Sequence, residues 1–208
     1  MMFEGIDISH HQGNIDFEKV KNKAHKNFVI LKAGGSDSKN GKQYKDKMFE
    51  TYYKQAKNAG LNVGCYWFAG KRFDGWKDAH YLYEKCLLGK TFEYPVFLDI
   101  EAQSMNDKYR TTIHSVEFCK DIESMGGYVG IYASDVYGFH ERLIIERIDQ
   151  FDFWVARYGK KPQYVKKYGM WQWSENGRIE GIKGHDVDLD VSYIDYPKIM
   201  KKYNLNKF

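Results

Sequence analysis

The sequence predicts a single α/β barrel, and three observations carry this prediction. Five apolar strand patterns alternate with five helical patterns over residues 5–148. Three further strand patterns follow, joined by polar loops that are too short for crossover helices. The eight strands together can close into a barrel, because strands that alternate with helices favour parallel pairing. No linker, low-complexity run or change of composition marks a boundary, so we expect one domain over residues 1–208.

The strand–helix units follow one another with clear periodicities. Residues 5–9 alternate apolar and polar side chains, as in a half-buried strand. Phe17, Val20 and Ala24 have helical spacing, and Gly60 suits the C-terminal cap of a later helix. The predicted strands are residues 5–9, 28–33, 61–69, 94–101 and 128–134, with Gly34 and Gly35 ending the second. The predicted helices are residues 16–24, 44–59, 74–88, 109–125 and 136–148.

The last third of the chain has a different rhythm. Strands are predicted over residues 151–158, 168–174 and 186–193, and a helix over 198–203 closes the chain. The barrel should therefore lack outer helices in this part. An open doubly wound sheet is the alternative, but no glycine-rich phosphate loop follows the first strand.

Composition excludes several classes of function. The net charge of +4 comes from scattered lysines, whereas a nucleic-acid reader usually clusters its basic residues. Cys65, Cys86 and Cys119 are odd in number and widely spaced, so we expect reduced packing thiols. No apolar run approaches the roughly 20 residues of a membrane span. The strand pattern begins near Phe3, so we expect no secretory signal in this sequence.

The strand end at residues 94–101 carries two acids, Asp99 and Glu101. Strand alternation places both side chains on one face, one pleat repeat apart. Two carboxylates this close cannot both ionise without cost, so one pKa should rise. A proton donor beside a retained anion is what glycosidic bond cleavage requires. Taken alone, the pair also fits a strand that enters a solvated loop.

Other strand ends supply the context that the acid pair needs. Chemistry in such barrels lies at the C-terminal ends of the strands. If the barrel closes, its first and eighth strands are neighbours, which brings Asp7 and Asp188 together. Aromatic faces suit sugar rings, and amide or hydroxyl groups suit their polar edges. Core packing remains the alternative for each aromatic residue by itself. The strand ends carry Asp7, Ser9, Trp67, Asp99, Glu101, Tyr132, Arg157, Tyr158, Gln172, Trp173 and Asp188.

Metal and nucleophile alternatives are weak. Asp186, Asp188 and Asp190 have the spacing of a calcium loop, but Val191 and Pro197 stand where that loop needs Gly and Glu. His10 and His11 are adjacent on an extended backbone, where their side chains diverge. Cys65 lacks the local signature of a catalytic thiol. We therefore expect no metal and no cofactor.

Six short motifs occur along the chain in a fixed order: Gly5-Ile6-Asp7-Ile8-Ser9 with Gln12, Asp99-Ile100-Glu101, Ile131-Tyr132, Trp154-Val155-Ala156 with Tyr158, Trp171-Gln172 and Asp188-Leu189. At these motifs the sequence resembles glycoside hydrolase family 25, and the resemblance spans residues 5–193. It implies an irregular TIM-like barrel, (β/α)5(β)3, in agreement with the strand count above. The family consists of lysozymes, N-acetylmuramidases that cut bacterial peptidoglycan as phage endolysins or autolysins.

The resemblance also implies roles for individual residues. Glu101 would be the general acid/base, with Asp99 as nucleophile or as stabiliser of an oxazoline formed by the substrate. Asp7 and Asp188 would support them. The family often has Asn where this sequence has Asp190. The extra acid could raise neighbouring pKa values, or it could simply be solvated. The expected substrate contacts are Tyr66, Trp67, Tyr132, Tyr158, Gln172, Trp173, Ser9 and Gln12.

Two other functions stay open. A chitinase-like hydrolase would need a longer acidic run, but Tyr94 and Phe97 stand where its earlier acids would be. A non-catalytic glycan-binding barrel would not need all four acids.

The expected partner is the glycan strand of peptidoglycan, bound by a monomer without nucleic acid, membrane or a separate wall-binding domain. We expect synthesis in the cytoplasm and action at the cell wall after lysis or non-classical release.

Overall fold

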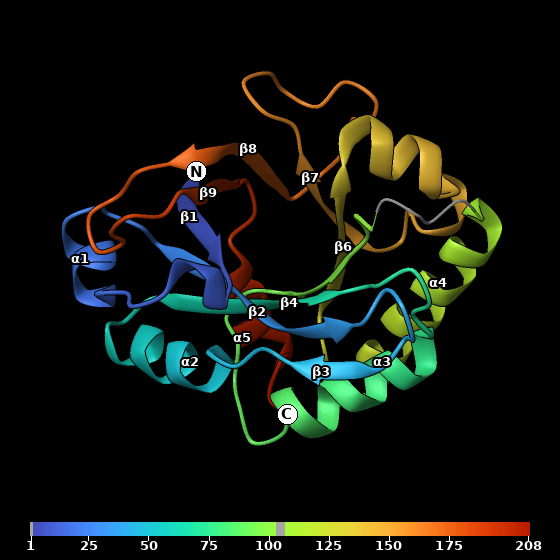
Figure 1. Cartoon of the computed structure of the whole chain (residues 1–208), viewed down its shortest axis with the longest axis horizontal. Helices are drawn as coiled ribbons and strands as arrows, with labels where there is room; N and C mark the ends of the chain where they lie inside the picture. Colours follow the sequence, from blue (N-terminus) through green and yellow to red (C-terminus); the bar gives the residue numbers. More distant parts are fainter. Residues whose placement is uncertain (1, 103–106) are drawn as a thin grey trace.

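Eight strands close into a barrel in the computed structural model, which describes residues 2–102 and 107–208 (Figure 1). The strand order is β1-β9-β8-β7-β6-β5-β4-β2, and pairing of β2 with β1 completes the ring. The barrel strands are β1 (Phe3–Ile8), β2 (Phe28–Ser36), β4 (Asn62–Phe68), β5 (Val96–Asp99), β6 (Val129–Ser134), β7 (Asp152–Ala156), β8 (Met170–Gly177) and β9 (Val187–Ser192). The predicted irregular α/β barrel is confirmed.

Strand β9 departs from the parallel arrangement. It is antiparallel to both of its neighbours, β1 and β8, whereas the other barrel strands pair in parallel. The N-terminal end of β9 therefore lies beside the C-terminal end of β1. This direction was not predicted, and it decides how Asp188 reaches the mouth of the barrel.

Helices cover the outside of the barrel. Helix α1 (Phe17–Asn22), α2 (Phe49–Asn58), α3 (Gly75–Leu82) and α4 (Lys108–Ser124) bury apolar residues in one cluster with the outward side chains of the strands. Asp16, Asp74 and Asp107 cap three of these helices by accepting a backbone N–H. In the described part of the chain, no helix is long and apolar enough to cross a membrane.

A second apolar cluster fills the lower half of the barrel. Helix α5 (Tyr196–Tyr203) contributes Tyr196 to it, and the ring of Tyr196 lies 5.2 Å from that of Tyr94. Phe28 stacks on Tyr94 with centroids 4.2 Å apart. Phe97 and Trp154 continue the column towards the mouth, with centroids 5.2 Å apart. Since this cluster fills the interior at the end where the parallel strands begin, only the opposite end, which we call the mouth, is available for a site.

The predicted helix over residues 44–59 begins too early. It starts at Phe49, and residues 43–45 instead form β3 (Gln43–Lys45), which pairs antiparallel with β2. Gly34 and Gly35 do not end β2 as expected, because both pair with β3. A Cβ on Gly34 would lie 2.1 Å from the carbonyl oxygen of Tyr44, so the close approach of β3 requires glycine.

The helix predicted over residues 136–148 is also wrong. A π turn over Asp135–His140 and a 3-10 turn over Ile145–Arg147 occupy this stretch. The helix predicted over 74–88 ends as α3 at Leu82 and continues as a π turn over Tyr83–Leu87.

Candidate active site

Four carboxyl groups meet at the open end of the barrel. Asp7 of β1 and Asp188 of β9 are register partners, as predicted from closure of the barrel. Asp188 is the second residue of the antiparallel β9, so it arrives from the start of its strand and not from the C-terminal end that we expected. Asp99 ends β5 and Glu101 follows two residues later. All four acids line one cavity with Tyr66, Tyr132, Trp154 and Gln172.

This acid cavity is small. Its volume is about 70 Å³, room for about two water molecules at their liquid volume of about 30 Å³ each. The four carboxyl groups therefore crowd around a narrow recess at the mouth of the barrel.

Asp99 and Glu101 differ in their environment. Asp99 is 3% exposed, and within the described residues its Oδ1 has no hydrogen-bond partner. Burial raises the pKa of Asp99 well above its usual value, and the charge of Glu101 raises it further. Burial also raises the pKa of Glu101, but the cations Lys32 and Arg142 lower it. These shifts favour the proton on Asp99 and the negative charge on Glu101, so Glu101 can act as a general acid only after a proton has moved to it.

A chain of hydrogen bonds fixes Asp7. The Gln172 Nε2 donates to Asp7 Oδ2 at 2.8 Å. The hydroxyl of Tyr132 donates to Gln172 Oε1 at 2.8 Å, and that of Tyr158 donates to the same oxygen at 3.1 Å. These two donors set the orientation of the amide, so Gln172 presents an N–H group to the carboxylate.

Asp190 lies beneath the acid cavity. It is 1% exposed, which rules out the expectation that it is simply solvated. The indole Nε1 of Trp154 donates to its Oδ1 at 2.8 Å, while no described residue partners Oδ2. Burial, and then the charge of Asp188, raise the pKa of Asp190 to about 8. The pKa of Asp188 is likewise raised to about 8, by burial and by Asp7.

A larger cavity of about 600 Å³ adjoins the acids and shares Glu101 and Tyr132 with the acid cavity. Tyr158, one of the expected sugar contacts, lies here together with Tyr137 and Arg142. Sequence reasoning missed Arg142, which follows an irregular segment without any periodicity.

Trp67 does not lie in the site, and its expected role as a substrate contact needs correction. It is fully buried on the helix side of β4, where its Nε1 donates to Asp78 Oδ2 at 3.0 Å. Strand alternation explains the difference, because Tyr66 faces the acid cavity and its neighbour must face outward. Trp173 is a similar case: Gln172 lines the acid cavity, while the next residue lies partly exposed and lines neither cavity.

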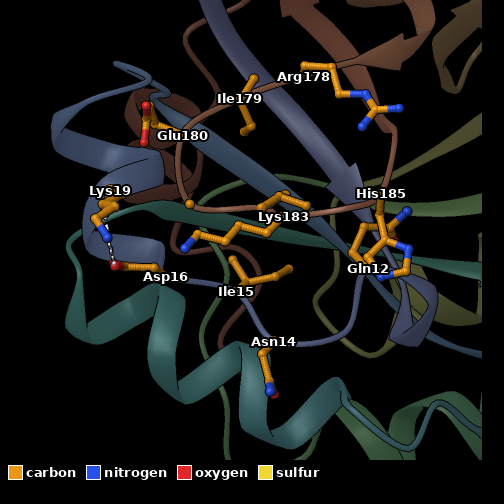
Figure 2. Close-up of a pocket in the computed structure, with 12 residues that line it drawn as sticks. Gln12, Asn14, Ile15, Asp16, Lys19, Arg178, Ile179, Glu180, Lys183 and His185 are labelled. Carbon is orange, nitrogen blue, oxygen red and sulfur yellow. Dashed lines mark hydrogen bonds and ion pairs between the residues drawn. The ribbon is translucent and has the colours of Figure 1, made fainter.

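Ser9 and Gln12 form a capping pair close to the mouth. The Ser9 backbone N–H donates to Gln12 Oε1 at 2.9 Å, and Ser9 Oγ accepts from the His11 N–H at 3.3 Å. Neither residue lines the acid cavity. Gln12 lies instead at one end of a separate cavity of about 850 Å³ between residues 12–19 and 178–185, which contains none of the four acids (Figure 2).

The remaining reactive side chains do not form a second centre. Within the described residues, no group of three His, Cys, Asp or Glu side chains could hold a metal ion. Cys65, Cys86 and Cys119 are free and buried. Burial raises the pKa of each thiol, which makes all three poor nucleophiles.

Comparison with known proteins identifies relatives of this architecture. The family model described as glycosyl hydrolases family 25 matches residues 6–182. An autolytic lysozyme of Clostridium acetobutylicum is 27% identical over 188 residues, which cover 90% of this chain and 55% of that protein. Lysozyme M1 of Streptomyces globisporus is 28% identical over 202 residues, with 89% of this chain and 66% of that protein covered.

The fold has a close match among solved structures. A bacterial lysozyme from Streptomyces coelicolor superposes with a TM-score of 0.77 at 25% identity, and 97% of each chain is covered. The chain spans between about half and two thirds of the length of the two curated relatives.

Proposed function

The chain belongs to the glycosyl hydrolases of family 25, and on this premise we propose that it is a lysozyme. Its substrate would be the glycan strand of bacterial peptidoglycan at the cell wall. The bond cleaved would be the β-1,4 linkage between N-acetylmuramic acid and N-acetylglucosamine. The observation that carries the proposal is the convergence of Asp7, Asp99, Glu101 and Asp188 on one aromatic-walled mouth.

Glu101 is the proposed general acid and base. Its side chain lines both the acid cavity and the larger adjoining cavity, so a bond lying across their boundary meets this carboxyl. Proton transfer by a positioned carboxyl typically contributes about 10²–10⁴ in rate. After the leaving sugar has taken the proton, the carboxylate accepts one from the attacking water.

Asp99 is the proposed partner. It either attacks the anomeric carbon or stabilises an oxazoline that the acetamido group of the substrate forms. The buried position and unpartnered Oδ1 of Asp99 favour an interaction that forms only with substrate. Asp7 is held by Gln172 for contact with the sugar, and Asp188, the register partner of Asp7, supports it at the mouth.

The test uses purified bacterial cell walls and two matched variants. Glu101→Gln should reduce the rate of wall lysis by about 10²–10⁴ without lowering the melting temperature. Glu146→Gln, an exposed glutamate outside both cavities, is the control and should lyse walls like the wild type. Near-normal turnover by Glu101→Gln would refute the role of Glu101.

Mass analysis of the released fragments identifies the bond. The proposal requires reducing ends on N-acetylmuramic acid with net retention at the anomeric carbon, which both roles of Asp99 predict. Reducing ends on N-acetylglucosamine would indicate a chitinase-like specificity, and inversion would exclude both roles of Asp99. Binding to walls without release would indicate a glycan-binding barrel.

A further inference from the structure

The cavity of about 600 Å³ beside Glu101 has the features of a specificity subsite. We propose that Arg142 in this cavity binds a carboxylate carried by the 3-O-lactyl arm of the muramoyl residue. This inference rests on the proposed function and adds a means by which the protein distinguishes muramic acid from glucosamine. The two sugars differ only in that arm, whose carboxyl is free or, in walls with peptide stems, amide-linked to a stem with an acidic residue.

The position of Arg142 ties it to the reaction centre. Its Nη1 donates to the main-chain carbonyl oxygen of Glu101 at 3.1 Å. It also lies close enough to the Glu101 side chain to lower the pKa of that carboxyl. A guanidinium has five N–H donors in a planar fork, and the bond to Glu101 accounts for one of them. The other donors suit a carboxylate, which the fork can bind in bidentate geometry.

The second cation of this cavity is already neutralised. Arg157 donates to Asp135 Oδ2 at 2.7 Å and to Gln163 Oε1 at 3.0 Å. Asp135 also accepts the backbone N–H groups of Gln163, Tyr164 and Val165, so this ion pair holds the loop after β7 in place. For Arg142, by contrast, no described acidic side chain forms a salt bridge. Among the described residues that line this cavity, Arg142 therefore carries the positive charge left for an anionic ligand.

The walls of the cavity suit the sugar to which the arm belongs. Tyr137 and Tyr158 are exposed and offer aromatic faces, on which the apolar face of a sugar ring packs. Tyr158 is also hydrogen-bonded to Gln172, which holds Asp7. A sugar ring placed on these two faces therefore lies beside the hydrogen-bonded residues that position Asp7.

The experiment measures a preference ratio. The substrates are a tetrasaccharide of alternating N-acetylglucosamine and N-acetylmuramic acid with free lactyl carboxylates, and its methyl ester. A charge-assisted hydrogen-bonded contact predicts that wild-type protein favours the acid by about 10- to 100-fold in kcat/KM. Arg142→Gln should bring this ratio close to one, and Arg142→Lys should retain part of it. Arg178→Gln, on the rim of the cavity in Figure 2, is the control and should keep the wild-type ratio.

A second measurement does not depend on turnover. The dissociation constant of the free-acid tetrasaccharide, measured with the Glu101→Gln protein, should rise by about 10- to 100-fold when Arg142→Gln is added. Tetrasaccharides with a dipeptide arm, ending in a free carboxylate or an amide, identify whether the lactyl or the stem carboxylate is bound. The inference is overturned if wild type shows no acid preference with either arm, or if Arg142→Gln keeps it. Cleavage on the wrong sugar would instead refute the proposed function.

Discussion

Replacing Asp190 by asparagine should stabilise the protein, and the gain should increase with pH. Asp190 is buried beneath the acid cavity, and its pKa is raised to about 8 by burial and by Asp188. Asparagine has the same shape and keeps an oxygen that accepts the indole N–H of Trp154, which now bonds Asp190 Oδ1. It removes the ionisable group without opening a cavity.

The magnitude follows from proton linkage. An aspartate in the unfolded chain titrates near 3.9, so between about pH 4 and pH 8 the folded protein binds more protons at this site than the unfolded chain. The stability that this group contributes is fully present below about pH 4 and is lost as pH rises towards 8, at up to about 1.4 kcal/mol per pH unit. Because Asp7 and Asp188 titrate together with it, we expect a gain of about 1–3 kcal/mol between about pH 5 and pH 7.

The assay is urea unfolding followed by tryptophan fluorescence at about pH 5, 6 and 7. The difference in the free energy of unfolding between Asp190→Asn and wild type should widen at each step, with a melting temperature advantage that grows by about 2–12 °C over the range. Asp149→Asn, an exposed aspartate, makes the same formal change and should show a constant difference. Parallel curves for Asp190→Asn and wild type would refute a raised pKa at Asp190.

Two further variants test the packing around the site. Trp67→Phe removes a donor from buried Asp78 and should cost about 1–3 kcal/mol in urea unfolding, with wall lysis per folded molecule unchanged because this indole lies on the helix side. A loss of lysis at unaltered stability would return Trp67 to the site. Gly130→Ala places a Cβ 2.6 Å from Phe97 in the barrel column, so the melting temperature should fall with a cost of about 1–3 kcal/mol. An unchanged melting temperature would show that the column yields without strain.

Local periodicity was enough to predict much of the site. The alternation of residues 94–101 placed Asp99 and Glu101 on one face, and the structure has both in the acid cavity. The count of eight strands was enough to pair Asp7 with Asp188 across the closing seam. Both inferences need only the two-residue repeat of a strand and the ring geometry of a barrel.

The features that were missed depend on long-range contacts. Residues 43–45 look helical locally, but they pair with β2 across the glycines that permit the approach. The direction of β9 depends on loops that carry no periodic signal, as does the position of Arg142. The prediction for Trp67 was wrong because side chains alternate along a strand up to its end. Tyr66 faces the acid cavity, so its neighbour Trp67 faces the helices.

The crowding of acids links stability to the proposed chemistry. Four carboxyl groups surround the mouth, a fifth lies beneath them, and two cations lie near: Asp7, Asp99, Glu101 and Asp188, then Asp190, with Lys32 and Arg142. Burying so many acids destabilises the folded protein as pH rises. The acids that remain ionised give the mouth a negative potential, which lowers the energy of an oxocarbenium-like transition state, in which positive charge develops on the sugar.

Asp190→Asn separates these two effects. Below about pH 8 the wild-type Asp190 is largely protonated, so its replacement removes little negative charge from the mouth. Turnover of cell walls at about pH 6 should then stay within about twofold of wild type while stability rises. A large loss of turnover at that pH would mean that Asp190 acts as an anion during the reaction. In that case substrate binding or the transition state must remove its proton, and the acid cluster would extend one residue deeper into the barrel than the four that line the cavity.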